Sequence, residues 1–430
     1  MTKVFIAEQE TLLEVQKQVD KLTNNLLPLD KPIYAMVIHE ASDLNPNSRV
    51  EYLGANKNFT PMSMNMSTHA MNYGSWADWS WLKANVPVMC NFDGGIDYYL
   101  NPNDYTKKAD GTDSDVSNVD YAGDAMSVIQ KIYKKEYKVG NDRYVFFCER
   151  KVDEDFKAVG FNVLGKERDY MLIPMFYGSI DANGKMRSIA GQWSCLTASG
   201  NASDNTTGTA IGTAEQYAAI QKASKNGLFF GGALVNTLAD ICVLLSKSTN
   251  SQAAFGYGMC STYVEDKAQH YGTQINTVVG GGQFYGSSDQ KSFNKIFHSC
   301  VMGSYMLWQR DPYMLLKNGR ILVSPDYTYD LTGATYLDTG VDLAANGYYA
   351  TTRVIEDFGS VPTDELVCSS ATGYCDHTWV NATILAVSLR FGNCHDGLGD
   401  GLFARPLNHV AAYAWWGYAA SKLLPAPAAA

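Results

Sequence analysis

The sequence is short of charge, of clustered basic residues and of long apolar runs. Only 18% of its 430 residues are charged, and 34 basic against 44 acidic side chains give a net charge of −10; about 25% charged residues is usual in globular domains. Without a lysine or arginine cluster, a phosphate-neutralising face is not expected. The most apolar stretch, residues 229–245, is short for a membrane span and contains Asn236 and Asp240, and Met1 is followed by acidic residues instead of a signal peptide. We therefore expect no nucleic-acid partner and no membrane insertion.

The usual signatures of catalysis and of metal binding are also missing. Nine cysteines are spread without a C-x-x-C pair, and seven histidines show no H-x-x-x-H or H-x-H spacing. We expect most of the cysteines to be small buried hydrophobic residues. Residues 286–290 lack the second glycine of a nucleophile elbow. The only candidate for a cofactor is a calcium ion near Asp110, Asp113 and Asp115, although these residue types are equally typical of tight turns.

What the chain has in excess is tyrosine, with 27 residues, and one clear helical pattern near its start. Apolar residues at spacings of 3, 4, 3 and 4 predict a helix within residues 1–27, with a seam of the coiled-coil kind over two heptads. Such a seam favours self-association; an amphipathic helix lying on its own domain is the alternative. Pro28 and Pro32 end the pattern. The seam residues are Leu12, Val15, Val19, Leu22 and Leu26.

The remainder predicts an α+β fold in two parts, a mixed β-rich domain over residues 28–166 and a second domain over 167–430. Short apolar runs between Asn, Asp, Gly and Pro clusters indicate strands, and longer apolar stretches indicate helices. Strands are expected at 34–38, 86–90, 143–148, 170–177 and 321–323, and helices at about 122–137, 214–224 and 234–247.

The segment 388–424 combines a sparse apolar frame with residues of mixed chemistry. Gly392, Gly397 and Gly401 supply turns, and polar and aromatic side chains stand between them. Adaptable polar and aromatic groups presented on loops are typical of a recognition surface. An ordinary domain edge is the alternative interpretation.

This segment resembles a known family. Phe391-Gly392, the pair Gly397 and Gly401, Leu407-Asn408 and Trp416 match the C-terminal pattern of phage proteins with a C-type-lectin fold, including the variable proteins of diversity-generating retroelements. Upstream, residues 373–379 resemble that family's approach to the variable region. Two departures are Cys394, where the family has Trp, and Trp415, which adenine-directed mutagenesis of Asn codons does not produce.

The resemblance implies a C-type-lectin-like domain, shared in fold with formylglycine-generating enzymes, on the surface of a virion. Family members usually form trimers and bind a host-cell receptor, a protein or a glycan, so residues 1–27 would align three chains and 28–166 would face the particle and its other proteins. The protein would be a tail fibre, spike or head fibre made in the bacterial cytoplasm. The implied receptor-binding positions are Asn393, His395, Asp396, Gly399, Asp400, Ala404, Arg405, Pro406, His409, Ala412, Tyr413, Trp415, Gly417 and Tyr418.

Two other functions remain open at this point. A formylglycine-generating oxidase would need a matched cysteine pair and a Gly-Phe-Arg ending, whereas this chain reads Gly417-Tyr418-Ala419. A structural fibre or decoration subunit would keep the fold without tight ligand binding. The expectation is therefore a non-catalytic binding protein.

Overall fold

The structure is a computed structural model, and its elements are mixed and strand-rich, as an α+β fold requires. The predicted helix within residues 1–27, with its seam Leu12, Val15, Val19, Leu22 and Leu26, lies outside the described residues. That helix stays a prediction. The structure describes residues 31–41, 44–192, 194, 211–262, 282–415 and 417–427.

The N-terminal sheet has four antiparallel strands in the order β2-β1-β10-β9. Met36 of β1 pairs with Val145 of β10, and both side chains face the main core, while Ala35 and Phe146 face a second apolar cluster. The sheet is therefore buried on both faces, and the strands predicted at 34–38 and 143–148 are confirmed. The strands are β1 (Tyr34–His39), β2 (Val50–Gly54), β9 (Tyr133–Val139) and β10 (Asp142–Cys148).

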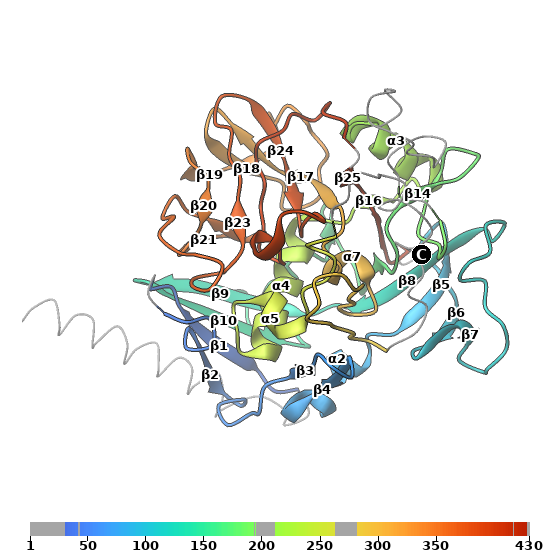
Figure 1. Cartoon of the computed structure of the whole chain (residues 1–430), viewed down its shortest axis with the longest axis horizontal. Coiled ribbons are helices and arrows are strands. Elements are labelled where there is room, and N and C mark those ends of the chain that lie inside the picture. The colour runs from blue at the N-terminus through green and yellow to red at the C-terminus, as the bar shows by residue number, and fades with distance from the viewer. Residues whose placement is uncertain are drawn as a thin grey trace, which may run out of the picture.

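A seven-stranded sheet joins both predicted domains (Figure 1). Its order is β16-β26-β13-β8-β5-β6-β7, so that the strands from residues 87–130 form one side of the sheet and pair through β8 with β13 of the second predicted domain. One apolar cluster likewise contains Met36 and Leu423. The boundary expected at residue 166 therefore does not separate two cores. The strands are β5 (Pro87–Asn91), β6 (Ile96–Asn101), β7 (Asp104–Lys108), β8 (Gly123–Gln130), β13 (Tyr170–Pro174), β16 (Leu228–Phe229) and β26 (Lys422–Pro425).

The helix predicted at 122–137 is wrong, because this stretch forms β8 and β9. Residues 123–129 are all buried: Ile129 packs in the main core, Ala125 in a second cluster and Val128 in a third. A strand covered on both faces has an uninterrupted apolar run, which periodicity does not distinguish from a buried helix.

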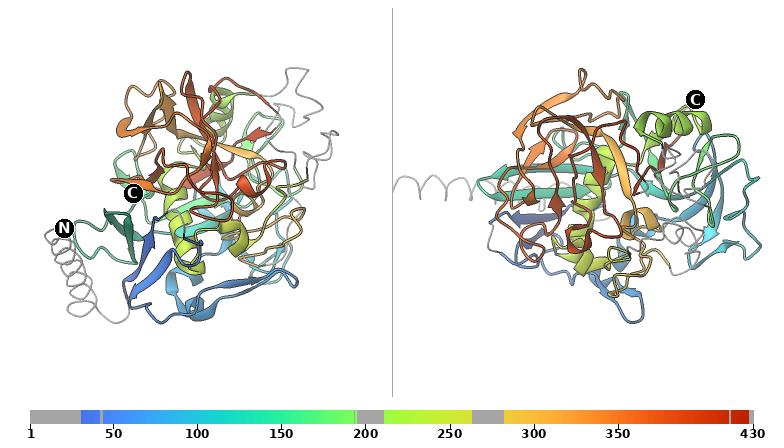
Figure 2. Two further views of the ribbon diagram at one scale, coloured as in Figure 1. Left: turned by 60° about the vertical axis from the view of Figure 1, so that its left-hand side comes forward. Right: turned by 45° about the horizontal axis from the view of Figure 1, so that its top comes forward.

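Helix α4 (Gly232–Ser246) confirms the buried helix predicted at 234–247 and lies inside the molecule with strands around it (Figure 2). Every residue from Gly232 to Leu245 is buried. Both polar interruptions have partners: Asn236 donates to the Phe358 carbonyl and accepts from Arg390 and Arg405, and Oδ2 of Asp240 accepts from Lys134 and Arg143 at 2.6 and 2.5 Å. Buried charges of this kind need such partners.

The C-terminal sheet has the order β19-β18-β17-β24, with β25 running parallel to β17. These strands are β17 (Trp308–Lys317), β18 (Arg320–Val323), β19 (Leu337–Asp342), β24 (Leu385–Arg390) and β25 (Tyr418–Ala419). Two-stranded pairs are β3 (Ser63–Asn65) with β4 (Ala70–Asn72), β11 (Asn162–Val163) with β12 (Lys166–Glu167), β14 (Ser179–Ile180) with β15 (Met186–Arg187), β20 (Gly347–Tyr348) with β23 (His377–Thr378), and β21 (Thr352–Ile355) with β22 (Gly359–Pro362). Further helices are η1 (Gly74–Asp78), α2 (Ser80–Lys83), α3 (Thr213–Ala223), α5 (Ser251–Phe255), α7 (Cys300–Gly303) and η3 (Gly397–Gly399).

Candidate functional site

The segment 388–424 begins and ends in the core and reaches the surface between. It starts in β24, passes through irregular loops and the short η3, and returns through β25 to β26. Isolated bridges fix the loops: Phe391 pairs with Gly401, and Ala386 of β24 pairs with Val410. The loops are therefore held by a rigid frame, which suits a binding site.

The predicted receptor-binding residues divide into an exposed set and a buried set. The residues that are at least partly exposed are His395, Asp396, His409, Ala412, Tyr413 and Trp415. The buried residues are Asn393, Gly399, Asp400, Ala404, Arg405, Pro406, Gly417 and Tyr418.

Several of the buried residues hold the frame together from inside. Arg405 donates to Oδ1 of Asn236 in α4 at 2.8 Å and to the carbonyl oxygens of Leu402 and Ala404. Burial lowers the pKa of Arg405 to about 9, and the positive charge of nearby Arg390 adds to this shift. Arg405 therefore supports the loop, and its guanidinium is not available at the surface.

Asn393 and Asp400 form a second buried contact under the loop. The backbone N–H of Asn393 donates to Oδ2 of Asp400 at 3.2 Å. Burial raises the pKa of Asp400 well above the ordinary value, with the negative charge of Asp396 as the second cause. Both side chains lie beneath the surface, where both polar atoms of the Asn393 amide and Oδ1 of Asp400 have no hydrogen-bond partner among the described residues.

Seven of the predicted residues nevertheless converge on one cavity of about 260 Å³, which we call the aromatic pocket. Buried Pro406 and Tyr418 contribute to it together with exposed residues, so that burial of a side chain does not exclude it from the wall. The pocket is lined by Trp308, Trp379, His395, Asp396, Pro406, Asn408, His409, Tyr413, Trp415 and Tyr418.

Tyr418 lies at the centre of the aromatic wall. Its ring centroid is 5.2 Å from Trp415, 5.6 Å from Tyr413 and 5.1 Å from His409. Tilted and edge-to-face ring pairs at these distances are mutually stabilising. The wall therefore offers rigid apolar area to a ligand at a low cost in conformational entropy.

Asp396 supplies the carboxylate of the aromatic pocket. The indole Nε1 of Trp308 donates to its Oδ2 at 3.1 Å, and Nε2 of His395 lies 3.6 Å from its Oδ1. Burial raises the pKa of Asp396, while His395 and the Trp308 hydrogen bond oppose the shift. Burial, with the charge of Arg310 as the second cause, lowers the pKa of His409, so its imidazole is neutral at pH 7.

Asn408 adds an unused acceptor to the aromatic pocket. Its Oδ1 is buried and has no hydrogen-bond partner among the described residues. A buried acceptor without a partner costs free energy, which a ligand donor can recover.

Three lining residues were not among the predicted positions. Trp379 and Asn408 lie in the motifs that resemble the family, so the sequence could have indicated that they lie near the site. Trp308 had none, because only the parallel pairing of β17 with β25 brings it opposite Tyr418. The backbone N–H of Trp308 donates to the carbonyl of Gly417 at 2.9 Å.

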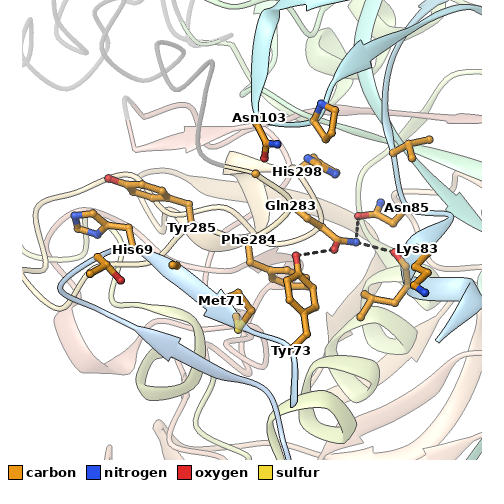
Figure 3. A pocket seen from close by; sticks show the side chains of 16 residues that line it. His69, Met71, Tyr73, Lys83, Asn85, Asn103, Gln283, Phe284, Tyr285 and His298 are labelled. Atoms are coloured by element: carbon orange, nitrogen blue, oxygen red, sulfur yellow. Dashed lines mark hydrogen bonds between the residues drawn. The ribbon is translucent and has the colours of Figure 1, made fainter. Parts of the chain in front are cut away.

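A second cavity, of about 520 Å³, lies beside the β3–β4 hairpin (Figure 3). Gln283 lies at the centre of its polar network: Tyr73 donates to its Oε1, and its Nε2 donates to Asn85 Oδ1 and to the Leu82 carbonyl. Both N–H groups of this amide are therefore already used within the protein. His69, in the left-handed region with φ of 58°, stacks on Tyr285 at 4.7 Å.

The proposed calcium ligands do not converge in the structure. Asp113 pairs with Lys107 at 2.5 Å, Asp115 accepts from Tyr98, and Asp110 accepts from Thr112 within its own turn. Among the described residues, no group of three His, Cys, Asp or Glu side chains is arranged to hold a metal ion. The turn interpretation of this loop fits these contacts.

Most described cysteines are buried, as the sequence predicted, with Cys368 the partly exposed exception. Burial raises the pKa of Cys375 to about 12, which keeps it a thiol at pH 7. Within the described ranges, no helix is both long and apolar enough to cross a membrane. Comparison with known protein families and with curated protein sequences finds no match.

Proposed function

We propose that this chain is a non-catalytic receptor-binding subunit of a phage virion, a tail fibre, spike or head fibre that binds a host-cell glycan or protein through the aromatic pocket. The observation that carries the proposal is the convergence of seven residues, named from a family resemblance, on one cavity. The seven lie within residues 395–418, and Trp308 and Trp379 from distant parts of the chain complete the same cavity.

The chemistry of the pocket supports binding. Its described lining residues include no serine, cysteine or lysine, and they offer aromatic rings, two imidazoles, one carboxylate and one unused amide oxygen. Rigid aromatic area with a few directional polar groups is characteristic of recognition sites. The loop-rich frame around 388–424 also suits a C-type-lectin-like domain, and we include that fold in the proposal.

Assembly as a homotrimer through residues 1–27 completes the proposal. Three copies would multiply weak single-site contacts by avidity, so a shallow pocket suffices for firm attachment. Light scattering of the purified chain tests this point: a trimer is expected at micromolar concentration, and a stable monomer would contradict it.

The binding test uses the exposed aromatic residues of the pocket. Replacing Tyr413 and Trp415 together by alanine should abolish adsorption of the purified protein to host cells. The matched control is Tyr99→Ala, because Tyr99 is 53% exposed and stands on β6, far along the chain from the pocket. Normal adsorption of the double variant would favour a purely structural fibre subunit.

The nature of the receptor is tested on the host cell. Periodate treatment destroys glycan rings and protease treatment removes surface proteins, so loss of adsorption after only one treatment assigns the class. If adsorption of the wild-type protein survives each treatment, binding to a surface receptor of either kind is contradicted.

A further inference from the structure

A second ligand site lies outside the segment 388–424. A cavity of about 340 Å³ opens between the β11–β12 hairpin, the C-terminal end of α3 and the loop after β18. We call it the basic pocket. Its volume is within the range of about 300–1,000 Å³ that is usual for small-molecule sites. The residues that matter to the argument are Lys166, Arg168, Gln221, Lys225, Tyr217 and Tyr329.

The charge of this cavity is opposite to that of the chain. Lys166, Arg168 and Lys225 line it, and its described lining residues include no Asp or Glu, although the whole chain carries −10. None of the three cations forms an ion pair with a described carboxylate. Like charges gathered in a cleft repel one another and attract an anion.

Two carboxylates that neighbour the lining residues in sequence are engaged elsewhere. Glu167, beside Lys166, pairs with Lys131 at 2.9 Å. Asp326 accepts from the backbone N–H of Thr328 and from the Ser324 hydroxyl within its own turn. Glu215 does not line the pocket, but after burial and Tyr217 its negative charge is a further cause of the raised pKa of Tyr329 and partly offsets the cations. The basic pocket therefore keeps a net positive lining.

Two buried polar atoms on the pocket's residues have no partner among the described residues. Arg168 donates from Nη1 to the carbonyl of Ala426 at 3.2 Å, but its Nε is buried and unpaired. The hydroxyl of Tyr329 is also buried and unpaired. Unpaired buried donors are rare in folded proteins and are stabilised by an incoming acceptor. Both donors would be satisfied by the oxygen atoms of an anion.

A flat aromatic wall stands beside these donors. The rings of Tyr217 and Tyr329 are stacked with centroids 3.8 Å apart and planes 15° from parallel. The buried ring of Phe229 lies beside this pair, 5.9 Å from Tyr217 and 6.1 Å from Tyr329. Because the two tyrosines cover each other's facing sides, a ligand ring packs on the outer face or along the edges of the pair.

We propose that the basic pocket binds a small ring-bearing anion, with a carboxylate, sulfate or phosphate group on a sugar-sized ring. The acid group contacts Arg168, Lys166 and Lys225, and the ring packs beside Tyr217 and Tyr329. This site does not depend on the aromatic pocket or on its proposed receptor, since the two cavities share no lining residue.

Calorimetric titration of the full chain with four probes tests the proposal. Glucuronate and glucose 6-phosphate should bind, and the tighter of the two shows whether the pocket prefers a carboxylate or a phosphate. Glucose, which has the ring without the charge, and inorganic phosphate, which has the charge without the ring, should each bind at least about tenfold more weakly. Equal binding of inorganic phosphate and glucose 6-phosphate would overturn the role of the aromatic wall, and failure of both acids at millimolar concentration would overturn the site.

Variants locate the binding. The double variant Lys166→Gln and Lys225→Gln should weaken binding of the better acid by about tenfold, because two exposed charges are lost. Tyr329→Phe, which removes only the unpaired hydroxyl, should weaken it about fivefold without loss of stability. Lys57→Gln, an exposed lysine remote from the pocket, is the control and should change nothing. Unchanged affinity in both test variants would overturn the assignment.

Discussion

The indole N–H of Trp308 donates a 3.1 Å hydrogen bond to the carboxylate of Asp396 and thereby ties strand β17 to the loop that carries the aromatic pocket. Trp308 is itself fixed by pairing with Tyr418 of β25. The polar group of the pocket is therefore oriented by a strand, and the loop does not have to order it when a ligand arrives. Preorganisation of this kind lowers the cost of binding.

Trp308→Phe should raise the pKa of Asp396 further. The hydrogen bond stabilises the charged carboxylate, so its loss favours the protonated form, by about one pH unit for a bond to a charged group. Carboxyl-carbon NMR of aspartate-labelled protein measures the titration midpoint. Tyr99→Phe, remote from the pocket, should leave the midpoint unchanged. An equal midpoint in Trp308→Phe would show that the hydrogen bond does not tune this group.

The same titration controls the pH dependence of adsorption. Asp396 has a raised pKa, so its negative charge is lost at a higher pH than that of an ordinary aspartate as the solution is acidified. Where the ligand donates to this carboxylate, adsorption weakens as pH falls through that pKa, and Asp396→Asn removes this step. Adsorption measured between pH 4 and 8 checks the expectation; an identical profile in the variant would contradict it.

Gly417→Ala should damage both the fold and the pocket. A Cβ atom at Gly417 would lie 2.3 Å from Cζ3 of Trp415 and 2.5 Å from Nδ2 of Asn393, so the Trp415 ring must move. Overpacking of this kind costs about 1–3 kcal/mol. Gly397→Ala is the comparison, because its Cβ would meet no atom within 4 Å and only the left-handed φ of 63° opposes it. The free energy of unfolding in urea and the adsorption to host cells should both fall more for Gly417→Ala than for Gly397→Ala.

Strands and helices with strong local patterns could be predicted from the sequence, and the sheet order could not. The runs at 34–38, 86–90 and 143–148 became β1, β5 and β10, because Asn, Asp, Gly and Pro clusters bound them on both sides. The seven-stranded sheet places β26 beside β13, and no local signal reports a pairing between residues so far apart. For the same reason the predicted boundary at residue 166 missed the shared core.

The candidate site could likewise be predicted only in part. The resemblance located the segment 388–424, and its aromatic and polar side chains do reach a pocket. Which of them face outward was not predictable, because irregular loops lack the period that sorts buried from exposed positions in strands and helices. Arginine is usually a surface residue, yet Arg405 donates a hydrogen bond to Asn236 of the buried α4.

Asp240→Asn should destabilise the protein strongly. Asp240 sits in α4 with no exposed side-chain surface and balances Lys134 at 2.6 Å and Arg143 at 2.5 Å. Glu136 still pairs with both cations at 2.8 Å, but they share one carboxylate in place of two, so the loss should be up to the roughly 3–5 kcal/mol of a broken buried pair. Urea unfolding monitored by tryptophan fluorescence measures the loss. Glu154→Gln, which breaks only the exposed pair with Lys151, should leave the midpoint unchanged. Equal midpoints for the two variants would contradict the importance of the buried network.

Asp400→Asn should stabilise the protein at neutral pH and lose this advantage in acid. Burial raises the pKa of Asp400, so the folded state holds its proton more tightly than the unfolded chain does. The stability that comes from the protonated group is fully present below the unfolded pKa, about 3.9, and is lost as pH rises through the folded pKa. At pH 7 and above, the wild-type chain therefore carries the cost of a buried charge that the amide lacks.

The measurement is the free energy of unfolding in urea at several pH values, for Asp400→Asn and the wild type in parallel. Groups with lowered pKa values, such as Asp240, destabilise both proteins equally on acidification, so the difference between the two proteins isolates Asp400. The amide oxygen of the variant can still accept the N–H of Asn393, which keeps the local frame. The difference should be largest near pH 8 and should shrink toward zero near pH 4. A difference that does not change with pH, or a variant less stable than the wild type at pH 7, would show that Asp400 is held in the folded protein as a satisfied anion.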